Sequence, residues 1–511
     1  MDIKKGSRIA VIGAGISGIA AANVLKKNGY QPIVFEKSKR LGGVWAVAYP
    51  DIHLQNTYFS YHLSDLPWSF QPDLHPSGSQ IMRYWNEAVG HLGLDVRLDH
   101  EVLALDEQND GWLLRYKNQA GTHEEPFGYV IIATGQYTEG KYRPQFAGEE
   151  QFSGAIITER DVCSLDVFDG KHVAVIGFGK SALDMSTFAA SRAKEVHHVF
   201  RTPRWTIPEW ILGLHFTHIL FSRFGTVMMT SWAHPTPAER FLHGPMKAGI
   251  DKFWDMIASL FKWQIERLGK GRDQAARERL SAVIPNHKFL PDLRSAGALA
   301  PESYYPFVAE GKIEPHLSEL AGFSENGLLL KNGSEIPCDL VVLSLGSKTP
   351  TYPFLPQQYR RFLESESDGA QLYRHLIHPR IPRIGFAGFN HCFMHIPAVE
   401  IGTLWLCAYL RGEIKLPPIE EMESSMERVR QWKRAHIQFE PSRLVAVNTR
   451  FQQYIDILLK DLGISPYRKL PNLFAEIFGR YGSADYEGIL EEYDHRNKRR
   501  SEPRALLQVD T

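Results

Sequence analysis

The sequence predicts an α/β fold with two parallel sheets, and three observations lead to this prediction. Residues 9–20 read IAVIGAGISGIA and residues 173–184 read VAVIGFGKSALD, so nearly the same phrase occurs twice. Each phrase runs from a β-branched stretch, typical of a buried parallel strand, through a glycine-rich turn into small residues that favour a helix. The 511 residues suffice for several hydrophobic cores, so two or more domains are expected.

Each phrase belongs to a longer strand–turn–helix–strand unit. In the first unit, the helix is expected to end near Asn28-Gly29, because this pair is a common helix stop. The apolar strand Ile33-Val34-Phe35 follows and places Glu36 at its end. In the second unit, the second strand closes on Val199-Phe200, with Arg201 and Arg204 just beyond it. A further buried strand, YVIIATG, is expected at 129–135.

The rest of the chain suggests how these units are connected. Residues 205–300 are rich in Trp, Phe and Leu at helical spacing, which predicts an inserted layer of helices. Strands resume near 312–346 and at 383–390, and residues 395–480 favour helices. We therefore predict a discontinuous first domain, an inserted second domain and a C-terminal segment: residues 1–165 with 330–445, residues 166–329 with the helical insertion at about 205–300, and residues 446–511 as helix and polar tail.

The composition excludes several classes of function. Lys plus Arg and Asp plus Glu both total 58, so the formal net charge is zero and no nucleic-acid partner is expected. Four cysteines without CxxC spacing argue against a disulfide framework, a dithiol redox centre and a zinc site. We predict no metal and a cytoplasmic location. No long uncharged apolar run predicts a transmembrane helix, while contact with a membrane surface and oligomerisation stay open.

The first glycine turn has the spacing GxGxxG between a strand and a helix. In such a turn, Gly13 permits the tight bend, Gly15 lets the backbone approach a pyrophosphate, and Gly18 lets helix and strand pack closely. Phosphates are stabilised at the helix N-terminus by free N–H groups and by the helix dipole. Glu36, at the end of the next strand, can accept hydrogen bonds from ribose hydroxyls. The first unit therefore predicts a dinucleotide site.

The second turn differs from the first in its charges. It contains Gly177, Gly179 and Ala182, and the residue after its second strand is Arg201 rather than an acid. A guanidinium can bind a ribose 2′-phosphate in a forked pair, so we predict that this site prefers NADPH, with Arg204 nearby. Lys180, inside the turn, would add positive charge. Two dinucleotides on one chain suggest hydride transfer from NADPH to a flavin.

The two turns are accompanied by motifs that together resemble those of flavin-containing monooxygenases. In order along the chain these are GAGISG, LGGVW, SDLPW, IIATGQY, GFGKSALD and GFNHCFMHIPAVEIGTLWL. The stretch LQNTYFSYHLSDLPW and the closing YGSADY are most similar to the plant and microbial branch. The resemblance runs from about residue 7 to residue 485. It implies two Rossmann-like domains, FAD in the first site and NADPH in the second, with the NADPH domain inserted in the FAD domain.

The resemblance also implies roles for residues at matching positions. FAD would be held by Gly13, Gly15, Gly18 and Glu36 and lined by Gly42, Gly43 and Trp45. Thr134 and Gly135 would mark the crossing between the domains. NADPH would be held by Gly177, Gly179, Ser181, Ala182 and Arg201.

Two departures from the family pattern fall near the domain junction. The fingerprint FxGxxxH is matched by Phe152 and Gly154, but residue 158 is Thr instead of His. The later ATGY-like turn reads SLGS at 344–347. Animal members carry a catalytic asparagine near the flavin, and counting back from SDLPW gives Gln55 at that position with Asn56 beside it. Either amide is a candidate for stabilising a flavin hydroperoxide.

The resemblance implies a monooxygenase that uses NADPH and O2 to oxygenate the nitrogen or sulfur of a small molecule through a flavin hydroperoxide. Baeyer–Villiger oxygenation of a ketone and an NADPH oxidase-like activity stay open as alternatives. A flavin-dependent disulfide reductase is disfavoured by the lack of CxxC, and a non-catalytic nucleotide-binding protein by the two intact turns.

Overall fold

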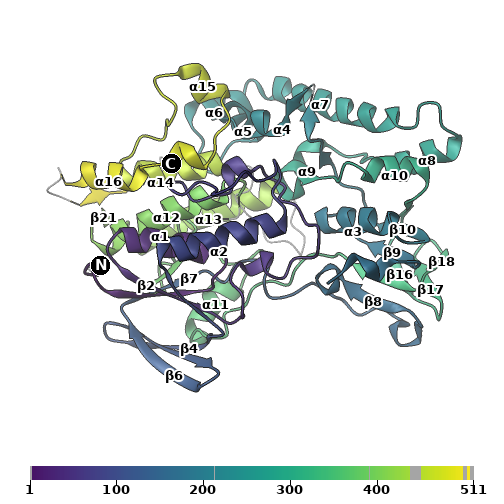
Figure 1. Ribbon diagram of the computed structural model, residues 1–511. Coiled ribbons are helices and arrows are strands. Elements are labelled where there is room, and N and C mark those ends of the chain that lie inside the picture. Colours follow the sequence, from purple (N-terminus) through teal and green to yellow (C-terminus); the bar gives the residue numbers. More distant parts are fainter. Residues whose placement is uncertain (1–2, 212, 391, 438–449, 499–502, 507–511) are drawn as a thin grey trace.

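The computed structural model describes residues 3–211, 213–390, 392–437, 450–498 and 503–506. Two five-stranded parallel sheets form the two halves of the molecule, which confirms the predicted α/β class with two Rossmann-like units (Figure 1). The helical insertion lies along the upper side of this view, above the second sheet.

The first sheet has the order β20-β7-β1-β2-β3, and all its pairings are parallel. Its central strands are apolar along their length because helices cover both faces of such a sheet. Helix α1 packs against α12, and α12 against α14. The bounds are β1 (Arg8–Ile12), β2 (Gln31–Glu36), β3 (Asp95–Leu98), β7 (Tyr129–Ile132), β20 (Ile384–Phe386), α1 (Ile16–Lys27), α2 (Gly78–Leu92), α12 (His395–Leu410) and α14 (Phe451–Leu462).

The second sheet has the order β15-β10-β9-β19-β8 and is also parallel throughout. Helix α3 packs on β9 and β10, and α10 lies between α3 and α8. The bounds are β8 (Ala155–Thr158), β9 (His172–Ile176), β10 (Glu195–Phe200), β15 (Glu314–Leu317), β19 (Leu340–Leu343), α3 (Lys180–Ala190), α8 (Gln274–Ala282) and α10 (Tyr304–Glu310).

The insertion combines helices with four two-residue strands, which the sequence did not predict. β11 pairs with β14, and β12 pairs with β13 as a hairpin. The bounds, in addition to α8, are β11 (Thr206–Ile207), β12 (Trp210–Ile211), β13 (Leu214–His215), α4 (Phe216–Leu220), α5 (Arg223–Met229), α6 (Pro237–His243), α7 (Lys247–Arg267), α9 (Phe289–Ala296) and β14 (Ala298–Leu299).

Two small antiparallel sheets and several peripheral elements complete the described fold. The sheets are β4-β5-β6 and β16-β17-β18. No helix of the described segments has the length and apolar character needed to cross a membrane. The bounds are β4 (Glu101–Gln108), β5 (Gly111–Asn118), β6 (Gly121–Phe127), β16 (Leu320–Phe323), β17 (Gly327–Leu330), β18 (Glu335–Pro337), β21 (Ile414–Lys415), β22 (Arg504–Ala505), α11 (Gln357–Glu364), α13 (Ile419–His436), α15 (Leu473–Phe478) and α16 (Ile489–Asn497).

The strand pairing does not follow the domain limits predicted at residues 165 and 330. β8 precedes residue 165 yet pairs with β19, and β19 follows residue 330 yet pairs with β9. Both strands therefore belong to the second sheet. β8 is short and carries no glycine turn, so only its distant partner reveals where it belongs.

Candidate active site at two glycine turns

The first glycine turn joins β1 to α1 at the carboxyl edge of the first sheet. Gly13 has a φ of 109°, and a Cβ atom there would lie 2.6 Å from the carbonyl oxygen of Ala133. A Cβ atom at Gly18 would overlap the carbonyl oxygen of Gly13. Gly15 is the N-cap of α1, and no side chain caps this helix. The first N–H groups of the helix therefore face the turn without an intrahelical partner, as an anion site requires.

A second glycine pair faces this turn. Gly42 donates its N–H to the carbonyl oxygen of Ala14 at 2.8 Å. A Cβ atom at Gly43 would lie 3.1 Å from the Cα of Gly15, so two stretches of bare backbone approach each other. Trp45 closes the short 3-10 turn Gly43–Trp45 and donates its indole N–H to the Tyr61 hydroxyl at 2.7 Å. This cradle, which added side chains would fill, suits the pyrophosphate of a dinucleotide.

Glu36 lies where the sequence analysis placed it, at the end of β2 beside the turn. Its carboxylate is 9% exposed and accepts the N–H of Ala14 at 2.8 Å and that of Ser38 at 2.9 Å. Each carboxylate oxygen can accept further hydrogen bonds, so the group can still bind ribose hydroxyls.

Thr134 and Gly135 follow β7, the neighbour of β1, at the same edge of the sheet. The hydroxyl oxygen of Thr134 and the Oε1 atom of Gln136 are buried and have no hydrogen-bond partner within the described chain. Unpaired buried polar atoms are costly, and they are explained when a ligand supplies the partner. These two atoms support a polar cofactor at this edge.

The sequence analysis missed a contact between the first helix and the late GFNHCF motif. A Cβ atom at Gly388 would overlap the Ser17 hydroxyl, and that hydroxyl lies 2.8 Å from Nε2 of His395. The close approach therefore requires glycine at 388. No local signal connects residues this far apart in sequence. The neighbouring His391 lies outside the described residues.

The second turn repeats the backbone design between β9 and α3. Gly177 has a φ of 125°, and a Cβ atom there would overlap the carbonyl oxygen of Ser344 in the SLGS turn. Gly179 is the N-cap of α3, again without a side-chain cap, and Ser181 lies in the first turn of that helix. Ala182 is fully buried at the place of the third glycine. This backbone therefore suits an anion in the same way as the first turn.

Lys180 forms an ion pair that the sequence analysis did not predict. Its ammonium group forms an ion pair with Asp184 one helical turn later, and Asp184 also accepts the Tyr49 hydroxyl at 2.7 Å. Because the Asp184 side chain is only 3% exposed, its charge needs this compensation. The positive charge of Lys180 is therefore directed to Asp184 instead of the turn.

Arg204 contacts a buried carboxylate of the insertion. Its guanidinium donates to Asp292 at 3.0 Å, and the fully buried carboxylate of Asp292 also contacts His287 at 2.7 Å and the N–H of Trp205 at 2.8 Å. A buried carboxylate must be paired, and Asp292 lies 88 residues away in sequence, which local reasoning could not anticipate. The structure thus gives Arg204 a role in anchoring the insertion.

Arg201 is exposed just beyond β10, at the position expected for a group that reads the ribose. It lines a hollow of about 420 Å³ together with Lys262 of helix α7. The Nζ atom of Lys262 lies 3.7 Å from Oε1 of Glu266, which also lines the hollow. The positive charges of Arg201 and Lys262 in this hollow suit a phosphate group.

Gln55 and Asn56 are neighbours in one loop, and their hydrogen bonds distinguish them. Asn56 is buried and donates its amide group to the carbonyl oxygen of Phe393 at 2.6 Å. Gln55 accepts the N–H of Leu299 at 3.0 Å through its carbonyl oxygen. Among the described residues, no group accepts a hydrogen bond from the Gln55 Nε2 atom. Gln55 therefore keeps a donor for a ligand, whereas Asn56 fastens two loops together.

Thr158, which replaces the family histidine, ends β8 at the domain junction. Its hydroxyl donates to Asp161 at 2.7 Å, and its N–H donates to the same carboxylate at 2.8 Å. The side chain therefore caps the following 3-10 turn. Beside it on the sheet, Ser344 follows β19, and its buried hydroxyl has no partner within the described chain.

The cysteines do not form a redox pair. All four are free, and three of them are buried. Burial raises the pKa of the Cys392 and Cys407 thiols and raises that of Cys338 to about 12, so their reactive thiolate forms are disfavoured. The burial of these three thiols therefore argues against dithiol chemistry at the described site.

Comparisons with known proteins agree with two dinucleotide sites on one chain. Residues 10–212 match a family described as pyridine nucleotide-disulphide oxidoreductase. Over 95% of the chain, the sequence is 29% identical to a probable flavin-containing monooxygenase 1 of Arabidopsis thaliana, covering 97% of that protein. It is 25% identical to human flavin-containing monooxygenase 1, over 92% of the chain and 84% of that protein. Among solved structures, an S-allyl-L-cysteine S-oxygenase from Allium sativum shares the fold with a TM-score of 0.61 at 18% identity, covering 97% of this chain and 99% of that one.

Proposed function

We propose that this chain, which belongs to the flavin-containing monooxygenase family, transfers one oxygen atom from O2 to the nitrogen of an amine or the sulfur of a sulfide. The chain is an NADPH-dependent flavin monooxygenase with FAD and NADPH as cofactors, acting on a small molecule and O2. In the balanced reaction, NADPH and a proton supply two electrons and two hydrogens, the substrate gains one oxygen atom, and the other oxygen leaves as water.

The first turn fits FAD. Gly13, Gly15 and Gly18 would hold the pyrophosphate, Glu36 the ribose, and Gly42, Gly43 and Trp45 would line the bound molecule. The orphaned polar atoms of Thr134 and Gln136 at the same edge support this assignment. When bound, FAD accepts a hydride from NADPH and activates O2, so the chain need not supply a redox group of its own.

The second turn fits NADPH. Gly177, Gly179, Ser181 and Ala182 would hold the pyrophosphate at the start of α3, and Arg201 would bind the 2′-phosphate. The hydrogen bond from Tyr49, in a loop of the FAD-binding part, to Asp184 on α3 connects the two sites. This connection supports a fixed geometry for hydride transfer between the two bound nucleotides.

The observation that carries the proposal is the placement of Gln55. Its side chain is fixed at one end by Leu299 of the insertion, while its amide NH2 group has no acceptor among the described residues. An amide donor held in this way can stabilise negative charge on oxygen. A soft nucleophile brings its own lone pair, so no nucleophilic side chain of the protein is required. The cytoplasmic location remains a prediction that rests on the free cysteines.

A product assay tests the proposal directly. The FAD-loaded protein is supplied with NADPH and O2 and offered a tertiary amine, a thioether and a cyclic ketone, and products are identified by mass spectrometry. We expect an N-oxide or a sulfoxide with one added oxygen and one NADPH consumed for each. Ester or lactone formation from the ketone alone would establish Baeyer–Villiger chemistry. Peroxide release without any oxygenated product would establish the oxidase-like alternative.

The variant Gln55→Leu sharpens this assay. It removes the amide and keeps the side-chain size, so we expect NADPH oxidation to continue while product falls and hydrogen peroxide rises. If the variant forms as much product per NADPH consumed as the unmodified protein does, Gln55 has no role in the reaction.

A further inference from the structure

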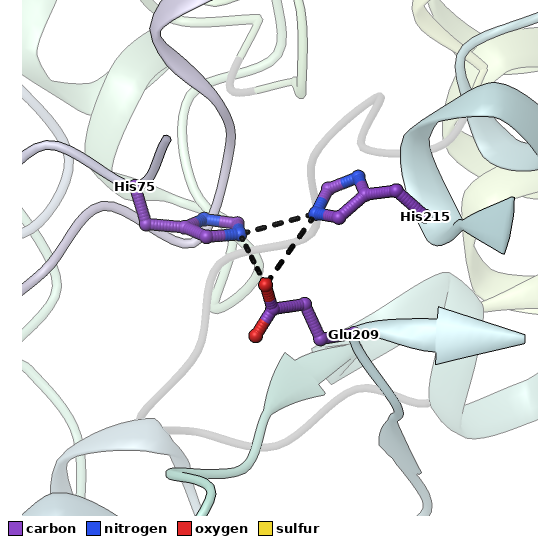
Figure 2. A group of neighbouring side chains, drawn as sticks. All are labelled: His75, Glu209 and His215. Atoms are coloured by element: carbon purple, nitrogen blue, oxygen red, sulfur yellow. Dashed lines mark hydrogen bonds and ion pairs between the residues drawn. The ribbon is translucent and has the colours of Figure 1, made fainter. Parts of the chain in front are cut away.

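Three side chains from segments that are distant in sequence lie close together where the insertion begins. His75 precedes α2, Glu209 directly precedes β12, and His215 is the last residue of β13 (Figure 2). The Nε2 atoms of the two histidines lie 3.2 Å apart. The Oε1 atom of Glu209 lies 3.8 Å from Nε2 of His75 and 3.9 Å from Nε2 of His215. Neither carboxylate distance is short enough for a hydrogen bond.

The three distances leave space for a metal ion between the ligand atoms, although the two Nε2 atoms are also within hydrogen-bond distance of each other. A circle through three points with these separations has a radius of about 2.1 Å, so one position lies about 2.1 Å from each ligand atom. Zinc is bound by imidazole nitrogen at about 2.0–2.1 Å and by carboxylate oxygen at about 2.0–2.2 Å. The donor set of two imidazoles and one carboxylate favours zinc and its transition-metal neighbours over magnesium or calcium.

The outer hydrogen bonds of His75 orient it as a ligand. Its Nδ1 atom lies 3.1 Å from the carbonyl oxygen of Leu54 and 3.0 Å from that of Asn56. Carbonyl oxygens only accept, so Nδ1 carries the hydrogen and Nε2 of the neutral ring presents a lone pair. Metal-binding histidines are commonly fixed by a hydrogen bond of this kind to a backbone carbonyl.

His215 has a partner that allows the same orientation. Its Nδ1 atom lies 2.8 Å from the Thr217 hydroxyl oxygen, which can accept a hydrogen from it. In the other tautomer, Nδ1 accepts the Thr217 backbone N–H at 3.4 Å, so metal binding replaces that long hydrogen bond with the one to the hydroxyl. With the hydrogen on Nδ1, both Nε2 lone pairs face each other at 3.2 Å beside a carboxylate, an arrangement that requires a cation between them. In the other tautomer the Nε2 hydrogen of His215 bridges to His75. The pair thus holds either a shared hydrogen or a metal ion.

The site is partly buried and open on one side. The His215 side chain is 5% exposed, that of His75 16% and that of Glu209 29%. The ring of Trp210 packs edge-on against His215, and the ring of Phe216 stacks on His75. Aromatic neighbours lower the local dielectric constant and so strengthen the attraction between a cation and the Glu209 carboxylate. Glu209 is the most exposed of the three side chains and marks the side from which an ion would enter.

We propose that His75, Glu209 and His215 bind one divalent transition-metal ion, Zn²⁺ by preference, with water as a fourth ligand. The ion fastens the β12–β13 hairpin of the insertion to the loop that carries Gln55, because His75 holds both carbonyls that flank Gln55. The sequence analysis predicted no metal, since one ligand lies more than a hundred residues from the other two. The site is independent of which substrate the enzyme oxygenates.

Metal binding is measured on the untagged, FAD-loaded protein. The protein is freed of metal with a chelator, dialysed against Zn²⁺, Mg²⁺ or Ca²⁺ separately, and analysed for bound metal. We expect one Zn²⁺ per chain and no retained Mg²⁺ or Ca²⁺. His75→Gln and Glu209→Gln should each weaken Zn²⁺ binding at least tenfold. His91→Gln, which changes an exposed histidine on α2, is the matched control and should bind as the unmodified protein does.

X-ray absorption of the zinc-loaded, unmodified protein makes the test independent of how the variants fold. We expect two imidazole ligands at about 2.0 Å. FAD content and circular dichroism verify that each variant is folded. The proposal is overturned if the protein retains no Zn²⁺, if the bound zinc has only oxygen ligands, or if folded His75→Gln and Glu209→Gln proteins bind Zn²⁺ as tightly as the control. Such results would identify a hydrogen-bonded histidine pair only.

Discussion

The two glycine turns share one backbone design and differ in what surrounds it. After the first turn, β2 ends in the buried carboxylate of Glu36, which accepts the N–H of Ala14 inside the turn. After the second, β10 leads to the exposed guanidinium of Arg201 beside a hollow. We therefore propose that the repeated backbone binds phosphate in both places, while one residue at the end of the following strand selects the ribose.

The third position of each turn shows a second difference. At Gly18, helix and turn are so close that a Cβ atom would overlap a carbonyl oxygen. At Ala182 a methyl group is present and fully buried, and it lies 3.6 Å from where a Cβ of Gly177 would be. The second helix thus leaves room for a methyl group that the first helix excludes.

Substitutions at these third positions should have the largest effect on FAD binding and activity. In Gly18→Ala the new methyl group must displace the Gly13 backbone, so we expect protein purified without bound FAD and activity reduced at least 100-fold. Ala182→Gly loses only helix propensity, about 0.5–1 kcal/mol, and should retain both cofactors. Flavin absorbance of the purified variants measures this. Equal FAD content in both variants would contradict the difference in helix packing.

The charge at the end of the strand should have the next largest effect. Arg201→Ala removes a charged contact to the 2′-phosphate, so the KM for NADPH should rise about 10- to 100-fold while the KM for NADH stays constant. Steady-state kinetics with both nucleotides measures the ratio. Arg192→Ala, just beyond the C-terminal end of α3, removes an exposed arginine and serves as control. An unchanged NADPH preference in Arg201→Ala would assign the 2′-phosphate to another group.

The strand after the second turn, β10, carries the buried His198 at the position that corresponds to Val34 in β2. His198 donates from Nε2 to the carbonyl oxygen of Gly177 at 2.6 Å and accepts the Tyr304 hydroxyl at 2.8 Å. Burial lowers the pKa of His198 to about 4, so the folded protein keeps it neutral while the unfolded chain protonates it below about pH 6.5. Stability is then lost as the pH falls from about 6.5 to 4, by up to about 3 kcal/mol.

His198→Gln should reduce this acid sensitivity. The glutamine amide can still donate to Gly177 but does not titrate, so the unfolding midpoint should vary less steeply with pH between 4 and 6.5. Thermal unfolding of the FAD-loaded protein at a series of pH values measures the slope. The same slope in the variant and the unmodified protein would show that His198 does not carry the effect.

Lys180 should give the smallest effect on cofactor binding. Because its charge is directed to Asp184, Lys180→Met should change the KM for NADPH less than about twofold. The variant should instead lower stability by about 1–3 kcal/mol, since Asp184 keeps only the Tyr49 hydroxyl. A rise of tenfold or more in the KM for NADPH would restore the prediction that this lysine contacts phosphate.

The features that the sequence predicted are those written in consecutive residues. Both strand–turn–helix units, the parallel sheets and the place of Glu36 follow from periodicity and glycine spacing, which act over a few residues. The pairing of β8 with β19 and the ion pair of Arg204 with Asp292 depend on distant segments. Their partners are set by the packing of the whole chain, which no local pattern reveals.

The same limit applies within the site. Gln55 and Asn56 were equivalent amides in sequence, and only the contacts with Leu299 and Phe393 distinguish them. His75, Glu209 and His215 had no common motif, because one ligand comes from the first half of the molecule and two from the insertion. Chemistry assembled from separate elements requires the fold before it can be recognised.

The central claim is that the first turn holds a flavin that the nucleotide in the second turn reduces. The most direct test mixes the FAD-loaded protein with NADPH in the absence of oxygen and follows flavin absorbance in a stopped-flow instrument, with O2 admitted afterwards. We predict that one NADPH per FAD bleaches the flavin completely and that NADH bleaches it more slowly. After O2 is admitted, we predict a long-lived absorbance band that belongs to neither oxidised nor reduced FAD, followed by the spectrum of oxidised FAD. Flavin that neither nucleotide bleaches would contradict the account.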